Sequence, residues 1–435
     1  MMRRLLLIAL SYLLIETYLP LSAFAETLDL SVNAEAAILM NADTGAILYE
    51  KNSRNLYFPA SITKIATAIY TLQKKGDDLD VKITAEQDIL GSVTEDVKRK
   101  SNYSTPSYIL VNGGTHIGIK KGEVLSLRNL LYGMMLASGN DASNVIAHYV
   151  GGGSIPQFIQ ELNVYLKKIG CLSTTFQNPH GLYHPKHETT AYDMAILTGE
   201  ALKNPQFRQI VSTVRYTRPK TNKQEASTLV QSNLLLRPGK LFYPKAIGVK
   251  TGHLALARNT FVGAAKDGNR TLIAVLLKVQ DRKDMFTDAV KMFEMAFSQP
   301  KIQRVLLKSG PQKFSLQLPG AKQLVATYLK ENATLEYYPA EEPKVKCLLT
   351  WENALILPIE KGTIVAHLSV QLEDGQVLKQ IPLNALETVD ATFWYNLKSF
   401  FSGISGKSAY LKVFGSIIIV LFLGFFAMQL RRKGS

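Results

Sequence analysis

The pattern of hydrophobic and polar positions places strands at both ends of residues 26–299 and helices between them. Alternation predicts a β-hairpin from 36–40 and 46–50, and further strands at 246–253, 260–266 and 271–277. Apolar residues recur at helical spacing at 126–150, 156–169, 190–203 and 285–297. Because strands from both ends must meet in one layer, the pattern predicts an α+β fold, in which an antiparallel five-stranded sheet packs against helices.

The pattern changes near residue 300. Short alternating segments at 314–318, 334–338, 344–350, 364–371 and 377–382 predict a small all-β domain. A chain of 435 residues is also too long for one compact core. We therefore expect one domain at 26–299 and a small β-sandwich domain at 300–389.

Both ends of the chain carry apolar segments that are typical of membrane targeting. Basic residues before an apolar stretch predict a signal peptide at 1–25, cut after Ala25. The uncharged run at 413–430 is long enough for a transmembrane helix, which we predict at 412–430, and the basic tail at 431–435 predicts a cytoplasmic end. A buried core helix is the alternative for this run. We expect an exported protein that a C-terminal helix anchors to the cytoplasmic membrane, with its body on the periplasmic or extracellular side.

Residues 390–411 place Phe and Trp at helical spacing between polar residues. This spacing predicts an amphipathic helix on the membrane surface, and a linker with a chance aromatic stripe is the alternative. The net charge of +15 suits anionic cell-wall polymers or lipid head groups. A generally solvated, lysine-rich surface explains the charge equally well. No nucleic-acid-binding motif is found, so we expect no nucleic-acid partner.

The two cysteines, Cys171 and Cys347, fall in different predicted domains. Export permits a disulfide, but two distant cysteines form no disulfide framework. We expect both to be buried thiols.

A Ser-x-x-Lys motif opens an apolar helix after Pro59 and Ala60. Ser61 and Lys64 are three residues apart, so they share one face of this helix and the amine can reach the hydroxyl. The first turn of a helix also favours developing negative charge. The alternative is an N-cap serine followed by a solvated lysine, which is the usual meaning of an isolated match.

A Ser-Gly-Asn motif follows the strongly apolar helix that begins near residue 126. Helical spacing resumes directly after it, which places Ser138 and Asn140 in the tight connection between two helices. An ordinary helix–helix turn is the alternative. The fixed order and long separation of this motif and the others make coincidence improbable.

A Lys-Thr-Gly motif lies in the strand predicted at 246–253, and it comprises Lys250, Thr251 and Gly252, followed by His253. Glycine in a strand removes side-chain bulk, so another backbone can approach. A bulge at a sheet edge is the alternative. Together the three motifs supply an alcohol nucleophile, an amine base and oxyanion donors, which a serine acyl-enzyme requires; no cofactor or metal is needed.

With these motifs the chain resembles a low-molecular-mass penicillin-binding protein, of the serine-type D-alanyl-D-alanine carboxypeptidase family. The resemblance extends from about residue 34 to 389 and includes Asp-Thr-Gly at 43–45, Asn-Pro-His-Gly-Leu at 178–182 and Pro-Ile-Glu-Lys-Gly at 358–362. It implies the fold shared by penicillin-binding proteins and serine β-lactamases. It also implies removal of the terminal D-alanine from peptidoglycan stem peptides, and acylation by β-lactam antibiotics. Residues 254–258 depart from the glycines and alanines that often follow the third motif.

Residue chemistry assigns a role to each motif. Ser61 is the expected nucleophile and Lys64 its base, with a pKa lowered by burial and by the charge of Lys250. Ser138 is expected to relay a proton to the leaving amine. The substrate side of the site is expected to comprise Asn140, Lys250, Thr251, Gly252 and His253, and the backbone N–H groups of Ser61 and His253 form the oxyanion hole.

Other functions remain open on the sequence. A β-lactamase needs a deacylating glutamate, and the stretch from Glu200 to Asn204 has only part of that pattern. A DD-endopeptidase and a non-catalytic penicillin-binding scaffold are further alternatives. His180, His184 and His187 suggest a zinc site, but Gly181 and Pro185 interrupt the helix that such a spacing requires. We expect these histidines in a loop beside the active site.

Overall fold

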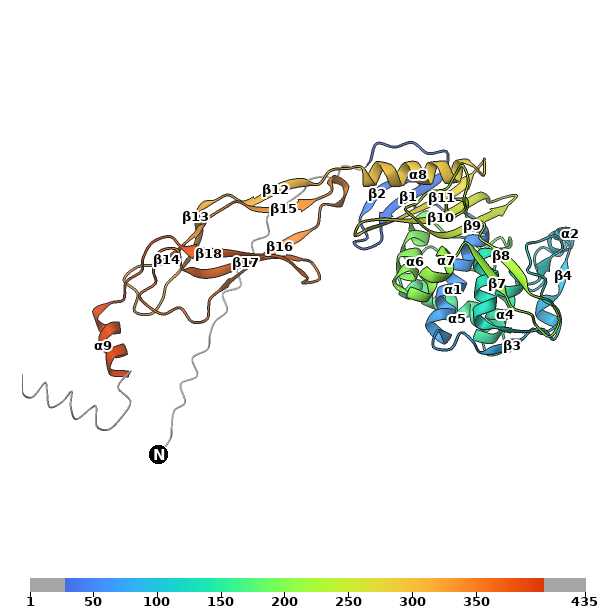
Figure 1. Ribbon diagram of the computed structural model, residues 1–435, viewed down its shortest axis with the longest axis horizontal. Helices are drawn as coiled ribbons and strands as arrows, with labels where there is room; N and C mark the ends of the chain where they lie inside the picture. Colours follow the sequence, from blue (N-terminus) through green and yellow to red (C-terminus); the bar gives the residue numbers. More distant parts are fainter. Residues whose placement is uncertain (1–27, 403–435) are drawn as a thin grey trace, which may run out of the picture. The chain divides into compact units, whose positions relative to one another are not determined.

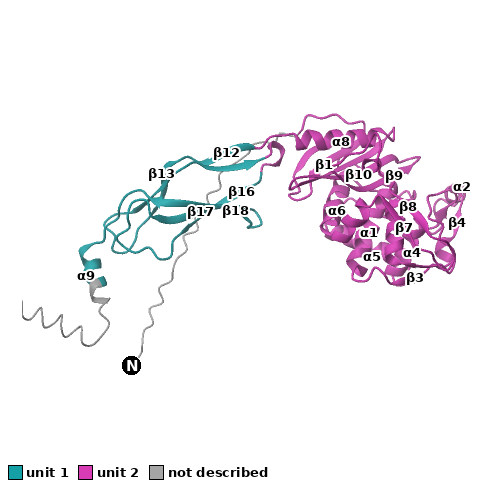
Figure 2. Cartoon of the chain, viewed as in Figure 1, with its two compact units in different colours: residues 1–23, 302–337, 343–435 teal, residues 24–301, 338–342 magenta. Residues whose placement is uncertain are grey.

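The computed structural model describes residues 28–402, which form two compact units. Unit 2 contains residues up to 301 together with 338–342, and unit 1 contains 302–337 and the residues from 343 (Figure 2). The sequence predicted one change of domain at residue 300. The short return of 338–342 to unit 2 has a local cause, because the Glu341 carboxylate accepts hydrogen bonds from Arg270 and Asn41 of that unit.

Unit 2 is built on an antiparallel five-stranded sheet in the order β2-β1-β11-β10-β9 (Figure 1). Its strands are β1 (Ala36–Asn41), β2 (Ile47–Lys51), β9 (Ala246–Leu254), β10 (Arg258–Asp267) and β11 (Arg270–Val279). This confirms the α+β class, the strand number and the antiparallel arrangement predicted from the sequence.

Helices cover both faces of this sheet. On β1, Ile38 and Met40 pack into the core with the helical middle, whereas Ala37 and Leu39 pack with α8 (Asp284–Phe297) on the other face. Successive strand residues point to opposite faces, so one strand contributes to both cores. The helical middle comprises α1 (Lys64–Lys75), α3 (Leu127–Leu136), α4 (Asn140–Val150), α5 (Ile155–Lys168), α6 (Ala191–Lys203) and α7 (Pro205–Ser212).

Short elements surround the helical middle. The predicted helical run at 126–150 is divided into α3 and α4 at Ser138, as its sequence indicated. The remaining elements of unit 2 are α2 (Glu95–Lys100) and the paired strands β3 (Lys82–Thr84) with β6 (Val124–Ser126), β4 (Ser92–Val93) with β5 (Leu110–Val111), and β7 (Arg215–Arg218) with β8 (Ser227–Val230).

Unit 1 consists of a five-stranded sheet in the order β13-β14-β18-β17-β16 and a two-stranded sheet of β12 and β15. Two of these strands, β12 and β14, were not predicted from the sequence, and in β12 each residue is exposed or only partly buried. The strands are β12 (Ile302–Leu307), β13 (Gly310–Leu316), β14 (Val325–Leu329), β15 (Ala333–Tyr337), β16 (Val345–Trp351), β17 (Ile364–Leu372) and β18 (Val377–Ala385).

The predicted membrane segments lie largely outside the described residues. Helix α9 (Phe393–Ser402) falls within the predicted amphipathic segment. The predicted signal peptide, transmembrane helix and basic tail are outside 28–402, and within that range no helix is both long and apolar enough to cross a bilayer.

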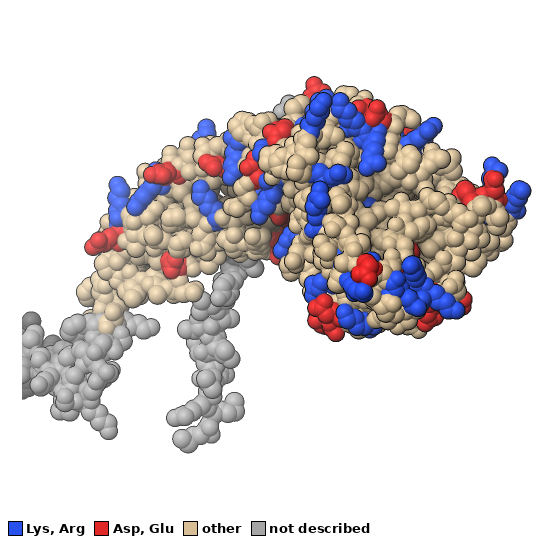
Figure 3. Space-filling view, turned by 45° about the vertical axis from the view of Figure 1, so that its right-hand side comes forward, with Lys and Arg blue, Asp and Glu red and all other residues tan. Residues whose placement is uncertain are grey.

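The surface charge and the cysteines can be compared with the sequence. On the face shown in Figure 3, Lys and Arg are interspersed with Asp and Glu over both units, as on a generally solvated surface. Cys171 and Cys347 are free and buried, which confirms that both are buried thiols.

Candidate active site

The Ser-x-x-Lys motif lies where a 3-10 turn, Ala60–Thr63, runs into α1. The sequence predicted Ser61 inside the helix, but α1 begins only at Lys64. Ala60 has a positive φ of 52°, which prevents the α-helix from continuing toward the N-terminus. The Thr63 hydroxyl closes the turn by donating to the Ala60 carbonyl at 2.9 Å. The turn still places the Lys64 Nζ 2.9 Å from the Ser61 Oγ.

The Lys64 amine is fully buried and has three oxygen neighbours. Besides the Ser61 hydroxyl, they are the Asn140 side-chain oxygen at 2.7 Å and the His180 carbonyl at 2.7 Å. An ammonium group donates to all three. A neutral amine has two N–H donors and one lone pair, so it can donate to the two carbonyl oxygens and accept from the Ser61 hydroxyl. The arrangement therefore aims the lone pair of a neutral Lys64 at Ser61.

Burial favours this neutral form. The pKa of Lys64 lies well below the ordinary lysine value, and burial is the largest cause. The charge of Lys250 lowers this pKa further. Asp141 acts in the opposite direction. Burial also lowers the pKa of Lys250 to about 7, with a further contribution from Arg282. The structure thus supplies both causes that the sequence analysis named for an active Lys64.

The Lys-Thr-Gly motif lies on β9, one of the two edge strands of the sheet, next to the Ser61 turn. A Cβ atom added to Gly252 would lie only 2.8 Å from the Ser61 backbone nitrogen and 2.4 Å from the Thr260 hydroxyl. Glycine is therefore required for the close approach of β9, as predicted. His253 follows with an exposed side chain, whose Nδ1 lies 3.2 Å from the Asn259 Oδ1.

The side chains of Lys250 and Thr251 are buried on the same strand. The Lys250 Nζ donates to the Thr251 carbonyl at 3.0 Å. The Thr251 hydroxyl lies 2.9 Å from the hydroxyl of Ser232, a residue that the sequence reasoning did not find. The segment at Ser232 belongs to no motif, and only its position beside β9 shows its relation to the site.

The Ser-Gly-Asn connection brings the second motif to the first through the bond between Asn140 and Lys64. Ser138 has a positive φ of 62°, which marks the sharp turn between α3 and α4. Among the described residues no protein group hydrogen-bonds to the Ser138 hydroxyl, so it is available to a substrate. The Asp141 carboxylate, also missed in the sequence, fixes this connection by accepting from the backbone N–H groups of Ile117, Gly118 and Ile119.

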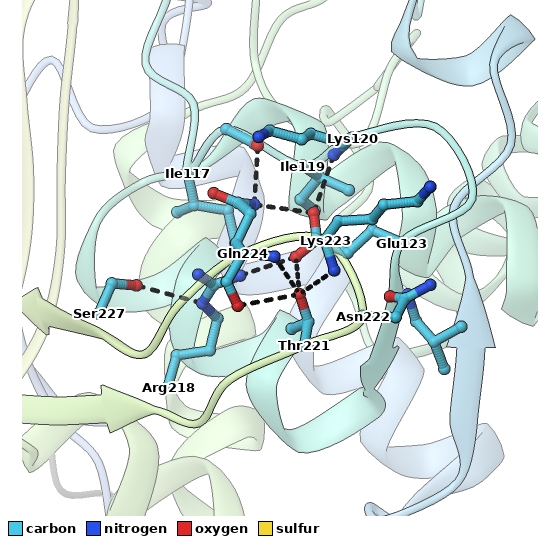
Figure 4. A network of polar contacts seen from close by, with 12 residues as sticks. Ile117, Ile119, Lys120, Glu123, Arg218, Thr221, Asn222, Lys223, Gln224 and Ser227 are labelled. Carbon is cyan, nitrogen blue, oxygen red and sulfur yellow. Dashed lines mark hydrogen bonds and ion pairs between the residues drawn. The ribbon is translucent and has the colours of Figure 1, made fainter.

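A buried polar network supports the loop that Asp141 holds (Figure 4). Glu123 and Arg218, both essentially inaccessible, form an ion pair at 2.9 Å. Gln224 donates both to Glu123, at 2.7 Å, and to the Gly118 carbonyl, at 2.9 Å. The network therefore links the β7–β8 hairpin to the loop that positions the second motif.

The loop histidines serve as structural groups. His187 is buried, accepts from the Gln177 N–H through Nδ1 at 2.9 Å, and has its Nε2 2.9 Å from the Thr63 hydroxyl. Burial lowers the pKa of His187 to about 3 and that of His180 well below its ordinary value. His180 contributes its backbone carbonyl to Lys64. Within residues 28–402, no cluster of His, Cys, Asp and Glu side chains could hold a metal ion.

The geometry fits a serine acyl-enzyme with a lysine base, and comparison with known proteins shows the family. The family described as D-alanyl-D-alanine carboxypeptidase, peptidase S11, matches residues 22–281. The D-alanyl-D-alanine carboxypeptidase DacF of Bacillus subtilis is 31% identical over 404 residues, which are 89% of this chain and 94% of the relative. The chain therefore belongs to the D-alanyl-D-alanine carboxypeptidase family, and it is a serine-type peptidase of the penicillin-binding-protein class.

Solved structures agree with this assignment. The D-alanyl-D-alanine carboxypeptidase DacD of Francisella tularensis is 25% identical, with a TM-score of 0.56, over 84% of this chain and 96% of that one. The DD-transpeptidase of Streptomyces K15 is 29% identical, with a TM-score of 0.54, over 62% of this chain and 100% of that one. The second protein therefore matches a smaller share of this chain than the first.

Proposed function

We propose that this protein is a D-alanyl-D-alanine carboxypeptidase, which removes the terminal D-alanine from peptidoglycan stem peptides through an acyl-enzyme on Ser61. The observation that carries the proposal is the contact of a buried Lys64 amine with the Ser61 hydroxyl at 2.9 Å. The lowered pKa of Lys64 makes the amine available as a base, and among its partners in residues 28–402 only the hydroxyl has a proton to give.

Acylation follows from these groups. Ser61 attacks the carbonyl of the penultimate D-alanine while its proton passes to Lys64. The negative charge that develops on the carbonyl oxygen is stabilised by the backbone N–H groups of Ser61 and His253. The close approach of β9 at Gly252 supports this pairing of donors. Ser138 then relays the proton to the leaving D-alanine, and water hydrolyses the acyl-enzyme.

The substrate binds as an added strand along β9. An edge strand has unpaired backbone groups, and an extended peptide can pair with them. Thr251 and Lys250 bind the terminal carboxylate, and Asn140 holds the substrate amide. A β-lactam enters the same path but keeps its leaving group attached, so its acyl-enzyme persists.

The β-lactamase alternative is less well supported. Glu200 pairs with Lys203 at 2.9 Å and its side chain is 39% exposed. In the part of the chain that the structure describes, no carboxylate is a hydrogen-bond partner of Ser61, Lys64 or Asn140. A site without such a carboxylate is suited to slow release of a β-lactam and turnover of a peptide.

The test is release of free D-alanine from a peptide that ends in D-Ala-D-Ala, with mass spectrometry after penicillin treatment. We expect an adduct on the peptide that contains Ser61 and loss of both reactions in Ser61→Ala. Ser212→Ala, which changes an exposed serine at the end of α7, is the matched control and should retain both. An adduct that survives Ser61→Ala would refute the assignment.

The location is proposed from sequence alone. The signal-peptide pattern at 1–25 and the apolar run at 413–430 support export and anchoring of the C-terminus in the cytoplasmic membrane, with the peptidase outside. We expect the full chain to stay with membranes through a carbonate wash. If that wash releases the chain, the membrane attachment is only peripheral and is made by the amphipathic segment.

A further inference from the structure

A cavity of about 170 Å³ lies in unit 2 beside the Ser61 turn. Phe58, in its wall, precedes Ser61 by three residues, so their Cα atoms are at most about 10 Å apart. Leu256, also in the wall, is four residues beyond Gly252 in the turn between β9 and β10. The cavity therefore lies near the reacting centre, on the side toward which β9 runs.

The direction of β9 shows which part of a substrate comes near this cavity. A peptide that pairs antiparallel to β9, with its terminal carboxylate at Thr251, has its preceding residues toward the end of the strand. The scissile carbonyl then lies at Gly252 and His253, as the oxyanion hole requires. The third residue from the terminus is then level with His253, and a long side chain on it can reach past Leu254 toward Leu256.

The wall of the cavity combines apolar side chains with one acid and one base. Leu56 and Leu256 at its rim are 52% and 56% exposed. Lys278 is already paired with Glu35 at 2.9 Å. Glu188 has no hydrogen bond or ion pair from its side chain among the described residues, so its carboxylate is available. The lining residues are Leu56, Tyr57, Phe58, Glu188, Leu256, Ala257 and Lys278.

Glu188 is held at a fixed position. Its backbone N–H and carbonyl both bond to Thr175 at 3.0 Å, and the adjacent Thr189 bonds to Tyr57 at 2.8 and 2.9 Å. On its other side, His187 is buried against Thr63 of the Ser61 turn. The acid is thus tied through short contacts to the turn that carries the nucleophile, which suits a site for substrate selection.

We propose that this cavity binds the side chain of the third residue from the substrate's terminus, and that Glu188 selects an apolar stem that ends in a primary amine. Lysine and diaminopimelic acid share this chemistry. The inference rests on the proposed function, because it uses the direction in which a D-Ala-D-Ala peptide lies on β9.

The experiment compares three peptides of the form Nα-acetyl-X-D-Ala-D-Ala with the full chain, where X is lysine, Nε-acetyl-lysine or diaminopimelic acid. We expect kcat/KM to be about five-fold higher for the two peptides with a free amine than for Nε-acetyl-lysine, as for a partly exposed ion pair. Glu188→Gln should reduce this ratio to about one by the same reasoning. Glu35→Gln is the control, because Glu35 pairs with Lys278 but does not line the cavity, and it should keep the ratio.

Each result has one meaning. No amine preference in the wild type, or the same preference in Glu188→Gln, would overturn the subsite while the release of D-alanine upheld the proposed function. A preference that Glu188→Gln and Glu35→Gln lose equally would also overturn it. No D-alanine from any of the three peptides would refute the proposed function and the subsite with it. A melting temperature close to the wild-type value ensures that Glu188→Gln is folded, and Glu188→Lys, which should favour Nε-succinyl-lysine, provides a second variant.

Discussion

Gly252→Ala should slow acylation strongly while leaving the fold in place. The added Cβ would lie 2.8 Å from the Ser61 backbone nitrogen, so strand and turn must separate by about 0.6 Å to reach the 3.4 Å of an ordinary contact. The Thr260 hydroxyl, at 2.4 Å, must also move. This shift displaces the two N–H donors of the oxyanion hole relative to each other. Loss of one such donor costs roughly 10²- to 10³-fold in rate, or about 3–4 kcal/mol.

The assay is the rate of acylation by a fluorescent penicillin, measured beside the melting temperature. Gly199→Ala is the matched control, because its Cβ would lie 3.7 Å from the nearest atom outside its own helix. That substitution is in α6, and alanine favours helix by up to about 1 kcal/mol over glycine, so the control should be active and no less stable. If a folded Gly252→Ala were acylated within about three-fold of the wild-type rate, the oxyanion-hole reasoning would be refuted.

Three further predictions concern the buried charges. Lys64→Arg should abolish acylation, because guanidinium does not release its proton. Lys250→Arg keeps its charge and should retain part of the peptide turnover. Equal, full activity in both variants would contradict proton transfer through Lys64. Folding lowers the pKa of Lys250 to about 7. Between pH 7 and the ordinary lysine pKa, the unfolded chain therefore binds more protons than the folded chain. The free energy of unfolding should rise with pH across that window. Lys250→Met should reduce this increase of the unfolding free energy with pH, and in denaturant titrations it should add about 1–4 kcal/mol of stability at pH 7. A less stable variant would show that burial of the Lys250 amine does not destabilise the fold. Glu123→Gln should cost about 3–5 kcal/mol in the same titrations, because it leaves the buried Arg218 charge unpaired. Glu225→Gln, in an exposed pair, should cost less than about 1 kcal/mol, and equal losses would show that burial is not the cause.

Much of the fold and the core of the site could be predicted from the sequence, because both depend on local patterns. Alternation identified β1, β2 and the strands from β9 to β11, and short turns join the strands within each of these two groups. Ser61 and Lys64 are one turn apart, so their contact follows from backbone geometry alone. Gly252 could be recognised since only glycine permits a close approach of two backbones.

Only the tertiary structure decided which distant groups complete the site. The His180 carbonyl that binds Lys64 is 116 residues away in the chain, and it acts through its backbone, which any residue could provide. Ser232 reaches Thr251 only because the segment after β8 lies beside β9. The lowered pKa of Lys64 depends on complete burial, which results from the packing of the whole unit and has no signature in the motif itself. A short motif can specify which atoms react, but desolvation and distant hydrogen bonds are properties of the folded chain.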